Sequence, residues 1–192
     1  MGAMEQRLRE ALSQRGKQHI IDAKLVPSVV LVPICYKQEE YYILFTKRTG
    51  RVKEHKGQIS FPGGACWEGD RTLLDTALRE CTEEIGLLPS QVKLLGELDD
   101  TVTMTSNYII FPFVGLIPWP YQFKVDGWEV EEIIEVPISA LLDKDSLRQQ
   151  TEIINGKEVT SYSYHYQGRV IWGATARILH QFLDILARVM EG

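Results

Sequence analysis

The sequence predicts an α/β (α+β) fold in which a few helices cover a mixed β-sheet. Short segments rich in β-branched and aromatic residues recur along the chain, as is typical of strands. Three other segments carry apolar residues at helical spacing, one near each end and one near the middle. The 192 residues contain no internal repeat and no obvious linker, so one domain spanning residues 1–192 is expected.

The first half of the chain is expected to begin with a helix and to continue with strands. An amphipathic helix is predicted over residues 5–15, where Leu8, Ala11 and Leu12 share a face. Two strands follow at 27–36 and 41–46, on either side of a turn-like segment, and a short third strand is expected at 57–61. The sequence Pro62-Gly63-Gly64 then interrupts regular structure.

A central helix is predicted from about Arg71 to Ile85. Its apolar positions form one helical stripe, namely Leu74, Ala77, Leu78, Cys81 and Ile85. Gly86 follows directly and Pro89 lies just beyond, and both residue types are typical where a helix ends.

The second half is expected to add strands, a hairpin and two helices. Strands are predicted at 92–98, 108–117 and 130–136, followed by a short helix at 137–142. Two further strands, at 151–154 and 159–166, flank Asn155-Gly156, a strong signal for a two-residue hairpin turn. Apolar residues at helical intervals predict a long packed helix over 173–190.

Composition and charge narrow the expected partners. The net charge of −5 argues weakly against a broad nucleic-acid surface. No apolar run approaches the roughly 20 residues of a membrane helix, and the first fifteen residues do not resemble a signal peptide. We therefore expect a cytoplasmic protein without nucleic-acid or membrane partners. The three cysteines match neither a disulfide framework nor a zinc site and are expected to be free thiols.

Three glutamates of the central helix, Glu80, Glu83 and Glu84, occupy neighbouring surface positions. Like charges four residues apart destabilise a helix by a few tenths of a kcal/mol, and the helix dipole disfavours anions near its C-terminus. Arg79 can pair with Glu83, but one arginine does not neutralise three carboxylates. A divalent cation would, and oxygen ligands favour Mg2+ or Mn2+, which also bind substrate phosphates. The alternative is a solvated acidic helix face.

The residues before this helix suggest how a phosphate could be bound. Gly63 and Gly64 permit close backbone approach, and a carbonyl of this turn could be a further metal ligand. Six basic or titratable residues fall within ten positions, namely Lys47, Arg48, Arg51, Lys53, His55 and Lys56. Arginine suits phosphate recognition through its two-pronged guanidinium group. A solvated basic turn, with His55 in a structural hydrogen bond, is the alternative.

Residues Gly64 to Leu87 resemble the Nudix box of the MutT-like hydrolases, which cleave nucleoside diphosphates linked to another group. The run from Arg79 to Leu87, "RECTEEIGL", matches the end of that box in order. The front of the box is one residue longer than the common form, so the expected upstream glutamate falls on or beside Asp70, with Glu68 close by.

The resemblance implies a fold and a set of site residues. The fold would be a Nudix-like α/β/α sandwich with a mixed β-sheet, and the whole chain would form a single Nudix hydrolase domain. Mg2+ or Mn2+ would be held chiefly by Glu80 and Glu84, with Glu83 and the carbonyl of Gly64 in support. Glu83, Glu84 and Arg79 would act in catalysis, with Arg79 orienting the glutamates.

A second motif resembles one branch of the family, the coenzyme A pyrophosphatases. The segment 44–64 reads "LFTKRTGRVKEHKGQISFPGG" and fits this branch, although Thr49 replaces a more usual serine or alanine. The segment 171–179, "IWGATARIL", is also similar. The branch implies hydrolysis of coenzyme A or its derivatives to 3′,5′-ADP and 4′-phosphopantetheine, with a substrate-binding set of Arg48, Arg51, His55 and Lys56.

Several alternatives remain open from the sequence. The substrate could be another small molecule, such as ADP-ribose or a dinucleotide, or the chain could be a non-catalytic Nudix-like binding module. The catalytic base could be Glu83 or an acid of the stretch that contains Glu129, Glu131 and Glu132. Aromatic residues at 162, 164, 166 and 172 could stack on adenine or simply pack a sheet face. A homodimer is also left open.

Overall fold

The computed structural model describes residues 2–51, 55–104, 106–154 and 157–191. Its larger sheet contains eight strands, which are β1 (Val26–Lys37), β2 (Glu40–Arg48), β3 (Ile59–Ser60), β4 (Gly63–Ala65), β5 (Lys93–Glu97), β6 (Thr101–Val102), β7 (Tyr108–Leu116) and β8 (Val130–Pro137). The smaller sheet contains three strands, which are β9 (Leu147–Ile154), β10 (Lys157–Tyr166) and β11 (Arg169–Trp172).

The larger sheet is mixed, as predicted. Its central path runs in the order β3-β2-β1-β7-β5. β1 pairs antiparallel with β2 but parallel with β7, and β8 adds to the outer side of β2 in antiparallel fashion. β4 and β6 pair with β1 and β7 respectively, off the central path.

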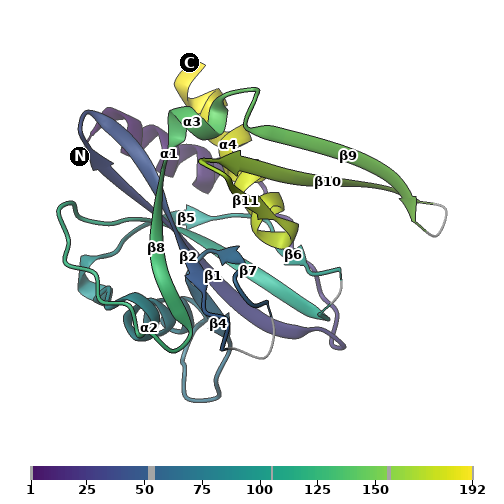
Figure 1. The fold of residues 1–192 in the computed structure, drawn as a ribbon, viewed down its shortest axis with the longest axis horizontal. Helices are drawn as coiled ribbons and strands as arrows, with labels where there is room; N and C mark the ends of the chain where they lie inside the picture. The colour runs from purple at the N-terminus through teal and green to yellow at the C-terminus, as the bar shows by residue number, and fades with distance from the viewer. Residues whose placement is uncertain (1, 52–54, 105, 155–156, 192) are drawn as a thin grey trace.

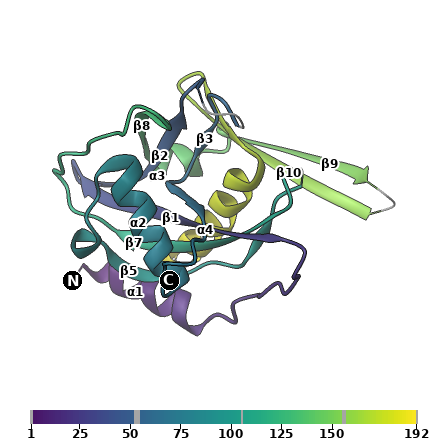
Figure 2. The same cartoon turned by 90° about the horizontal axis from the view of Figure 1, so that it is seen from below.

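Helices cover both faces of this sheet. They are α1 (Ala3–Gln14), α2 (Leu73–Ile85), the short α3 (Ile138–Leu142) and α4 (Gly173–Glu191), with a 3-10 turn at Pro89–Gln91. Figure 1 shows α2 below the sheet and α1 and α4 above it, and Figure 2 shows α2 in front of β1 and β7. Successive β1 residues alternate accordingly: Leu31 packs in the α2 core, whereas Val32 packs in the α1 and α4 core. The predicted α/β/α arrangement is therefore confirmed.

The boundaries of α2 follow from its capping residues. Thr72 lies before the helix, and its hydroxyl accepts a hydrogen bond from the Asp75 N–H at 3.1 Å. Gly86 ends the helix with a left-handed φ of 69°, and its N–H donates to the Thr82 carbonyl at 3.0 Å. The Leu87 N–H donates to the Cys81 carbonyl at 3.2 Å, which completes the C-terminal cap.

Three strands were not predicted, and each depends on contacts distant in sequence. β4 consists of Gly63, Gly64 and Ala65, where the sequence predicts only a break, and it forms because its backbone pairs with β1. β6 has two residues and pairs with β7, whereas β11 pairs with β10. Such short segments carry no periodic pattern of their own.

The β9–β10 hairpin extends away from the body of the molecule (Figure 1). The two strands pair antiparallel from Ile154 opposite Lys157 to Leu147 opposite Tyr164. The predicted turn residues Asn155 and Gly156 lie outside the described residues. At its base the hairpin packs on α4 through the buried Tyr164, whose hydroxyl oxygen lies 2.8 Å from His180 Nδ1.

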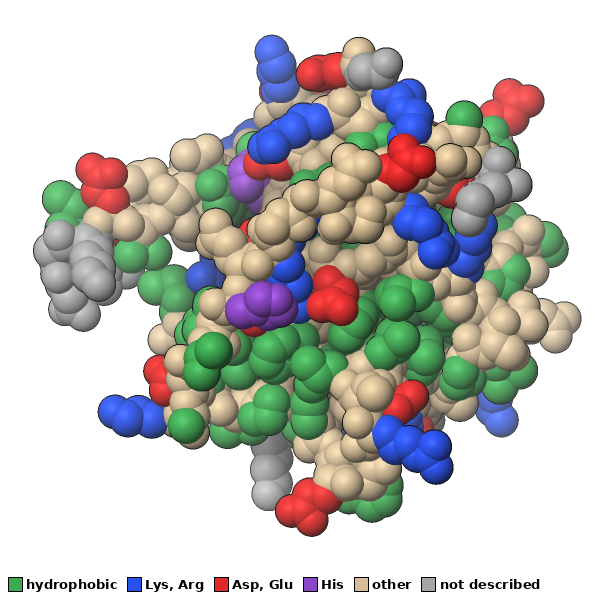
Figure 3. All heavy atoms as spheres, turned by 180° about the vertical axis from the view of Figure 1, so that it is seen from behind, with side chains coloured by type: hydrophobic (Ala, Val, Ile, Leu, Met, Phe, Trp, Pro, Cys, Tyr) green, Lys and Arg blue, Asp and Glu red, His purple; other side chains and the backbone are tan. Residues whose placement is uncertain are grey.

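Helix α1 and the segment that follows it are attached to the sheet by buried leucines and by ion pairs. Leu8 and Leu12 enter the core, while Lys93 pairs with Glu5 at 2.9 Å and Lys17 with Asp100 at 3.1 Å. Viewed from behind, basic and acidic side chains are interspersed, with hydrophobic side chains gathered near the centre (Figure 3). Among the described helices, none is long and apolar enough to cross a membrane.

Candidate active site

A cavity of about 980 Å3 lies between the larger sheet and the smaller one. One end is formed by Arg48 of β2, His55, the β3–β4 segment and Glu129. The far side is formed by the β9–β10 hairpin and by the residues that join β11 to α4. The glycines Gly63 and Gly64 lie at the end from which the glutamates of α2 approach.

Glu84 is a buried carboxylate beside this cavity. Its side chain is only 4% exposed, and its Oε2 accepts a hydrogen bond from the Gly63 N–H at 3.1 Å. Burial raises the pKa of Glu84 from 4.5 to about 8, and the nearby negative charges of Glu129 and Glu80 add to this effect. A positive charge beside Glu84 would stabilise its ionised form and so lower this raised pKa.

Glu80 lies one helical turn before Glu84 and against Gly64. A Cβ atom added to Gly64 would lie 2.6 Å from the Glu80 carboxylate. Burial also raises the pKa of Glu80, while its ion pair with Arg79 acts in the opposite direction. The Gly64 carbonyl accepts a 2.9 Å hydrogen bond from the Ser28 hydroxyl, and Gly64 pairs with Val29 of β1 in the sheet.

The two glycines are expected to respond differently to alanine. A Cβ at Gly63 would lie 2.1 Å from the Val29 carbonyl oxygen, so Gly63→Ala should disrupt β4 and lower the melting temperature by more than about 5 °C. The three atoms nearest to a Cβ at Gly64 all belong to the Glu80 carboxylate, a side chain that can shift, so Gly64→Ala should melt within about 3 °C of wild type but lose about tenfold or more in activity. Calorimetry measures the melting temperature of each variant, and turnover with Mg2+ measures its activity. An equal fall in melting temperature in the two variants would contradict this prediction.

Arg79 joins the remaining acids of the site. Its guanidinium group donates to Asp70 at 3.1 Å, to Glu83 at 2.9 Å and to Glu80 at 2.7 Å. The hydrogen bonds from Arg79 lower the pKa of Asp70. Asp70 lies at or beside the position where the Nudix box has its upstream glutamate, and in this structure it is a partner of Arg79. The sequence predicts that Glu80, Glu83 and Glu84 share one surface patch, and the structure differs. Glu83 is 60% exposed and faces Arg79, whereas Glu84 is buried.

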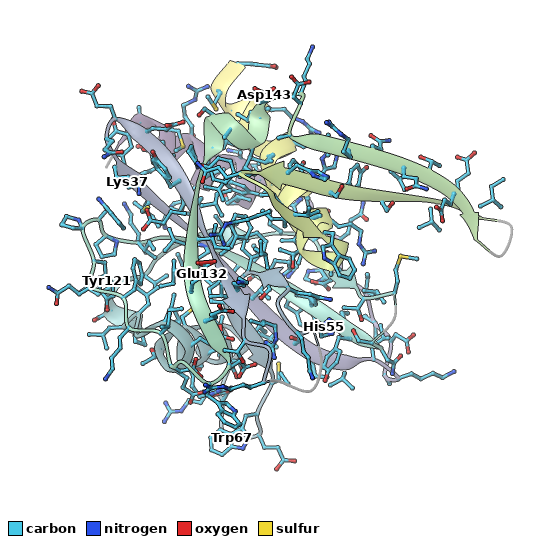
Figure 4. The ribbon with its side chains drawn as sticks, viewed as in Figure 1. Lys37, His55, Trp67, Tyr121, Glu132 and Asp143 are labelled. Carbon is cyan, nitrogen blue, oxygen red and sulfur yellow. The ribbon has the colours of Figure 1, made fainter. Side chains whose placement is uncertain are left out.

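Of the three candidate acids in the later segment, the structure brings Glu129 to the cavity. Glu129 lines it and pairs with Arg48 at 2.7 Å. Glu131 instead pairs with Lys47 at 3.4 Å, and Glu132 pairs with Arg169. Figure 4 shows Glu132 on β8, away from His55.

The loop that carries Glu129 is held by hydrogen bonds to α2 and β2. The Asp126 N–H donates to the Glu84 carbonyl at 3.1 Å, and the Asp126 carboxylate accepts from the Glu129 N–H at 3.0 Å. Thr49, the residue that departs from the branch pattern, is buried and donates to the Trp128 carbonyl at 2.6 Å. Its N–H also donates to the Glu129 carbonyl at 2.8 Å. These contacts place Glu129 beside Glu84.

The four predicted substrate-binding residues divide into two pairs. Arg48 and His55 line the cavity, and His55 Nδ1 lies 2.9 Å from the Gln58 amide oxygen. Arg51 and Lys56 are exposed residues of the same loop and do not line the cavity. Lys53 of the basic segment lies outside the described residues.

The aromatic residues near the C-terminus also divide. Tyr164 is buried in the core, and the partly buried Tyr166 packs against the same core. Tyr162 stacks on His180 with ring centroids 3.9 Å apart, but it also lines the cavity, as does the half-exposed Trp172. Tyr121 lies at the opposite edge from His55 (Figure 4), where its hydroxyl donates to the Gly86 carbonyl at 2.9 Å.

The donor set suits a hard divalent cation. Within the described part of the chain, no three His, Cys, Asp or Glu side chains converge closely enough to form a complete metal site. Glu80 and Glu84 nevertheless have raised pKa values and lie against the Gly63-Gly64 backbone. With two carboxylates and a carbonyl as protein ligands, a divalent cation would keep coordination positions for water and substrate phosphate, which is the usual arrangement for Mg2+. The residues therefore fit such an ion.

Comparison with known proteins establishes the family. The NUDIX domain family matches residues 24–156. This chain belongs to the Nudix family. A protein described as uncharacterized Nudix hydrolase NudL from Photorhabdus laumondii is 36% identical over 154 residues, covering 80% of this chain and 81% of the relative. The NudL protein of Pectobacterium atrosepticum is 34% identical over 163 residues, covering 80% and 79% respectively.

Solved structures agree with the Nudix fold. A MutT/nudix family protein from Enterococcus faecalis superposes with a TM-score of 0.59 at 13% identity, covering 100% of this chain and 76% of that protein. The NUDIX domain of Shewanella oneidensis NrtR, crystallised with ADP-ribose, gives 0.51 at 19% identity, covering 69% and 84%. Nudix membership supports pyrophosphate hydrolysis of a nucleoside diphosphate derivative, and enzymes of the family generally use divalent metal ions such as Mg2+ or Mn2+.

Proposed function

We propose that this Nudix protein hydrolyses the diphosphate bond of coenzyme A or its derivatives, giving 3′,5′-ADP and 4′-phosphopantetheine, with Mg2+ or Mn2+. One observation carries the proposal: the residues of two separate motifs meet at one cavity. Arg48, His55 and the Gly63-Gly64 backbone line it, and Glu80 and Glu84 of the Nudix box lie against those glycines.

Each side chain has a role that follows from its position. Glu80, Glu84 and the Gly64 carbonyl would hold the cation, which when bound offsets phosphate charge and acidifies a water. Arg79 holds Glu80 by an ion pair and thereby orients its carboxylate. Arg48 presents a guanidinium group to the cavity and suits a diphosphate oxygen. His55 lies on the same wall, and because its Nδ1 donates to the Gln58 amide oxygen, the Nε2 of the neutral ring can accept a hydrogen bond from the substrate.

Glu129 is the best-placed general base. It lines the cavity, where it pairs with Arg48, and lies close enough to Glu84 and Glu80 to raise their pKa values, whereas Glu83 is not among the residues that line the cavity. Glu129 can therefore accept a proton from a water that attacks phosphorus.

Glu129→Gln is expected to lower kcat by about 100-fold to 10,000-fold, because a positioned base contributes about that much. Glu132→Gln is the matched control: this acid pairs with Arg169 outside the cavity, so its loss should change kcat by less than about twofold. Equal kcat values for the two variants would remove Glu129 from the mechanism.

A substrate panel tests the proposed function. Purified protein with Mg2+ or Mn2+ is incubated with coenzyme A, acetyl-coenzyme A, NADH, ADP-ribose and a diadenosine polyphosphate, and products are identified by chromatography. We expect coenzyme A and its acetyl derivative to be cleaved most efficiently, to 3′,5′-ADP. Efficient cleavage of ADP-ribose with no cleavage of coenzyme A would reject the coenzyme A assignment. No turnover on any compound would favour the non-catalytic binding module.

A further inference from the structure

Arg177 is a charged residue on the cavity wall to which the proposed mechanism gives no role. It belongs to α4, five residues after Trp172, and lines the cavity together with Thr103 and Thr175. Its guanidinium group donates a hydrogen bond to the carbonyl of Val102 on β6. Arg177 therefore lies at the side of the cavity away from the α2 glutamates.

The charge of Arg177 lacks an acidic partner. Within the described residues, no carboxylate lies at ion-pair distance from its guanidinium group, whereas Arg48 pairs with Glu129 at 2.7 Å. Burial lowers the pKa of Arg177, whereas carboxylate partners raise the pKa values of Arg79 and Arg169. A partly buried charge without a counter-ion destabilises a protein. When such a group lines a cavity, an anionic ligand is the natural partner.

A second arginine approaches the same cavity from the hairpin. Arg148 is the second residue of β9, and its guanidinium group donates to two backbone carbonyls, those of Asp145 at 2.9 Å and Leu147 at 3.1 Å. Arg148 also lines the cavity and has no acidic partner among the described residues. In the smaller sheet, Ser163 lies opposite both Arg148 and Trp172, so these three residues form one row across the strands.

We propose that Arg177, assisted by Arg148, binds a phosphate group of the substrate other than the diphosphate that is cleaved. This inference rests on the proposed function, because it assumes that the diphosphate lies at the Gly63-Gly64 end of the same cavity. The substrate class is then a nucleoside diphosphate derivative with a further phosphate on its ribose. The first turn of α4, Gly173 to Thr175, also lines this region, and N–H groups of a first helical turn have no acceptor within the helix.

The test compares two substrates that differ by this phosphate alone, coenzyme A and dephospho-coenzyme A. We expect wild type to have a kcat/KM at least about tenfold higher for coenzyme A. Arg177→Gln should lower kcat/KM for coenzyme A about tenfold and for dephospho-coenzyme A by less than about twofold. Arg177→Lys should retain part of the preference because it keeps a positive charge. Arg188→Gln is the control, since this exposed arginine of α4 lies outside the cavity and should leave the preference unchanged.

Equal losses on both substrates would overturn the inference and assign Arg177 a structural role. If wild type cleaves both substrates equally well, the second phosphate site is rejected while diphosphate hydrolysis stands. If neither substrate is cleaved but ADP-ribose is, the coenzyme A assignment fails, and the phosphate site is tested by calorimetric binding of 3′,5′-ADP and of 5′-AMP. Tighter binding of 3′,5′-ADP that is lost in R177Q supports the site. Equal binding of the two nucleotides rejects it. Should R177Q not fold, R148Q replaces it, with an expected preference loss of about threefold.

Discussion

Glu84→Gln is expected to lower kcat for diphosphate hydrolysis by at least about 100-fold, because the variant loses a carboxylate that holds the cation. Glutamine has nearly the same shape, and its amide oxygen can still accept the hydrogen bond from the Gly63 N–H. The fold should therefore persist. Turnover of coenzyme A is measured with saturating Mg2+ and again with Mn2+, together with the near-UV circular dichroism of each protein.

A matched control comes from the same helix. Asp75 is an exposed acid in the first turn of α2, away from the cavity, so Asp75→Asn removes one negative charge without touching the site. Its kcat should stay within about twofold of wild type. A Glu84→Gln enzyme that retained more than a tenth of the wild-type turnover would contradict a metal-holding role for this residue.

The second large effect is a loss of stability of the metal-free protein as pH rises. Burial raises the pKa of Glu84 to about 8, against 4.5 for an ordinary glutamate. Between these values the folded protein retains a proton that the unfolded chain has released, so the free energy of unfolding falls as pH increases. A shift of this size corresponds to a loss on the order of 3 to 5 kcal/mol from pH 5 to pH 8.5.

The measurement is urea unfolding in a chelator at several pH values between 5 and 8.5. Glu84→Gln has no titrating group at this position, so its stability should change much less over the same interval. Asp70 and Glu132, whose pKa values are lowered by arginine partners, titrate below this interval and do not obscure the comparison. Parallel pH dependences for wild type and variant would show that Glu84 does not govern the effect.

Added metal extends the same experiment. A cation bound by Glu80 and Glu84 requires ionised carboxylates, so Mg2+ or Mn2+ should restore most of the stability lost at pH 8.5. The ion stabilises only the folded protein, and this restoration should be absent in Glu84→Gln. Restoration of equal size in both proteins would place the ion elsewhere.

Much of the fold could be predicted from the sequence because its signals are local. Thr72 and Gly86 lie at the two ends of α2, with its apolar stripe between them, and these features act within a few residues of chain. The alternation along β1 likewise reflects a sheet covered on both faces. The pairing of Arg79 with Glu83 follows from helical spacing alone, and the structure shows it at 2.9 Å.

The tertiary structure decided which of several similar residues reach the cavity. Glu129, Glu131 and Glu132 are chemically alike, and only the docking of Asp126 on the end of α2 directs Glu129 to Glu84. The sequence likewise could not show that Asp70 joins Arg79, or that Arg177 of α4 lines the cavity. Helix patterns depend on neighbours three or four residues away and strand patterns on neighbours two residues away, whereas the environment of a side chain depends on residues that are distant in sequence and meet only when the layers pack.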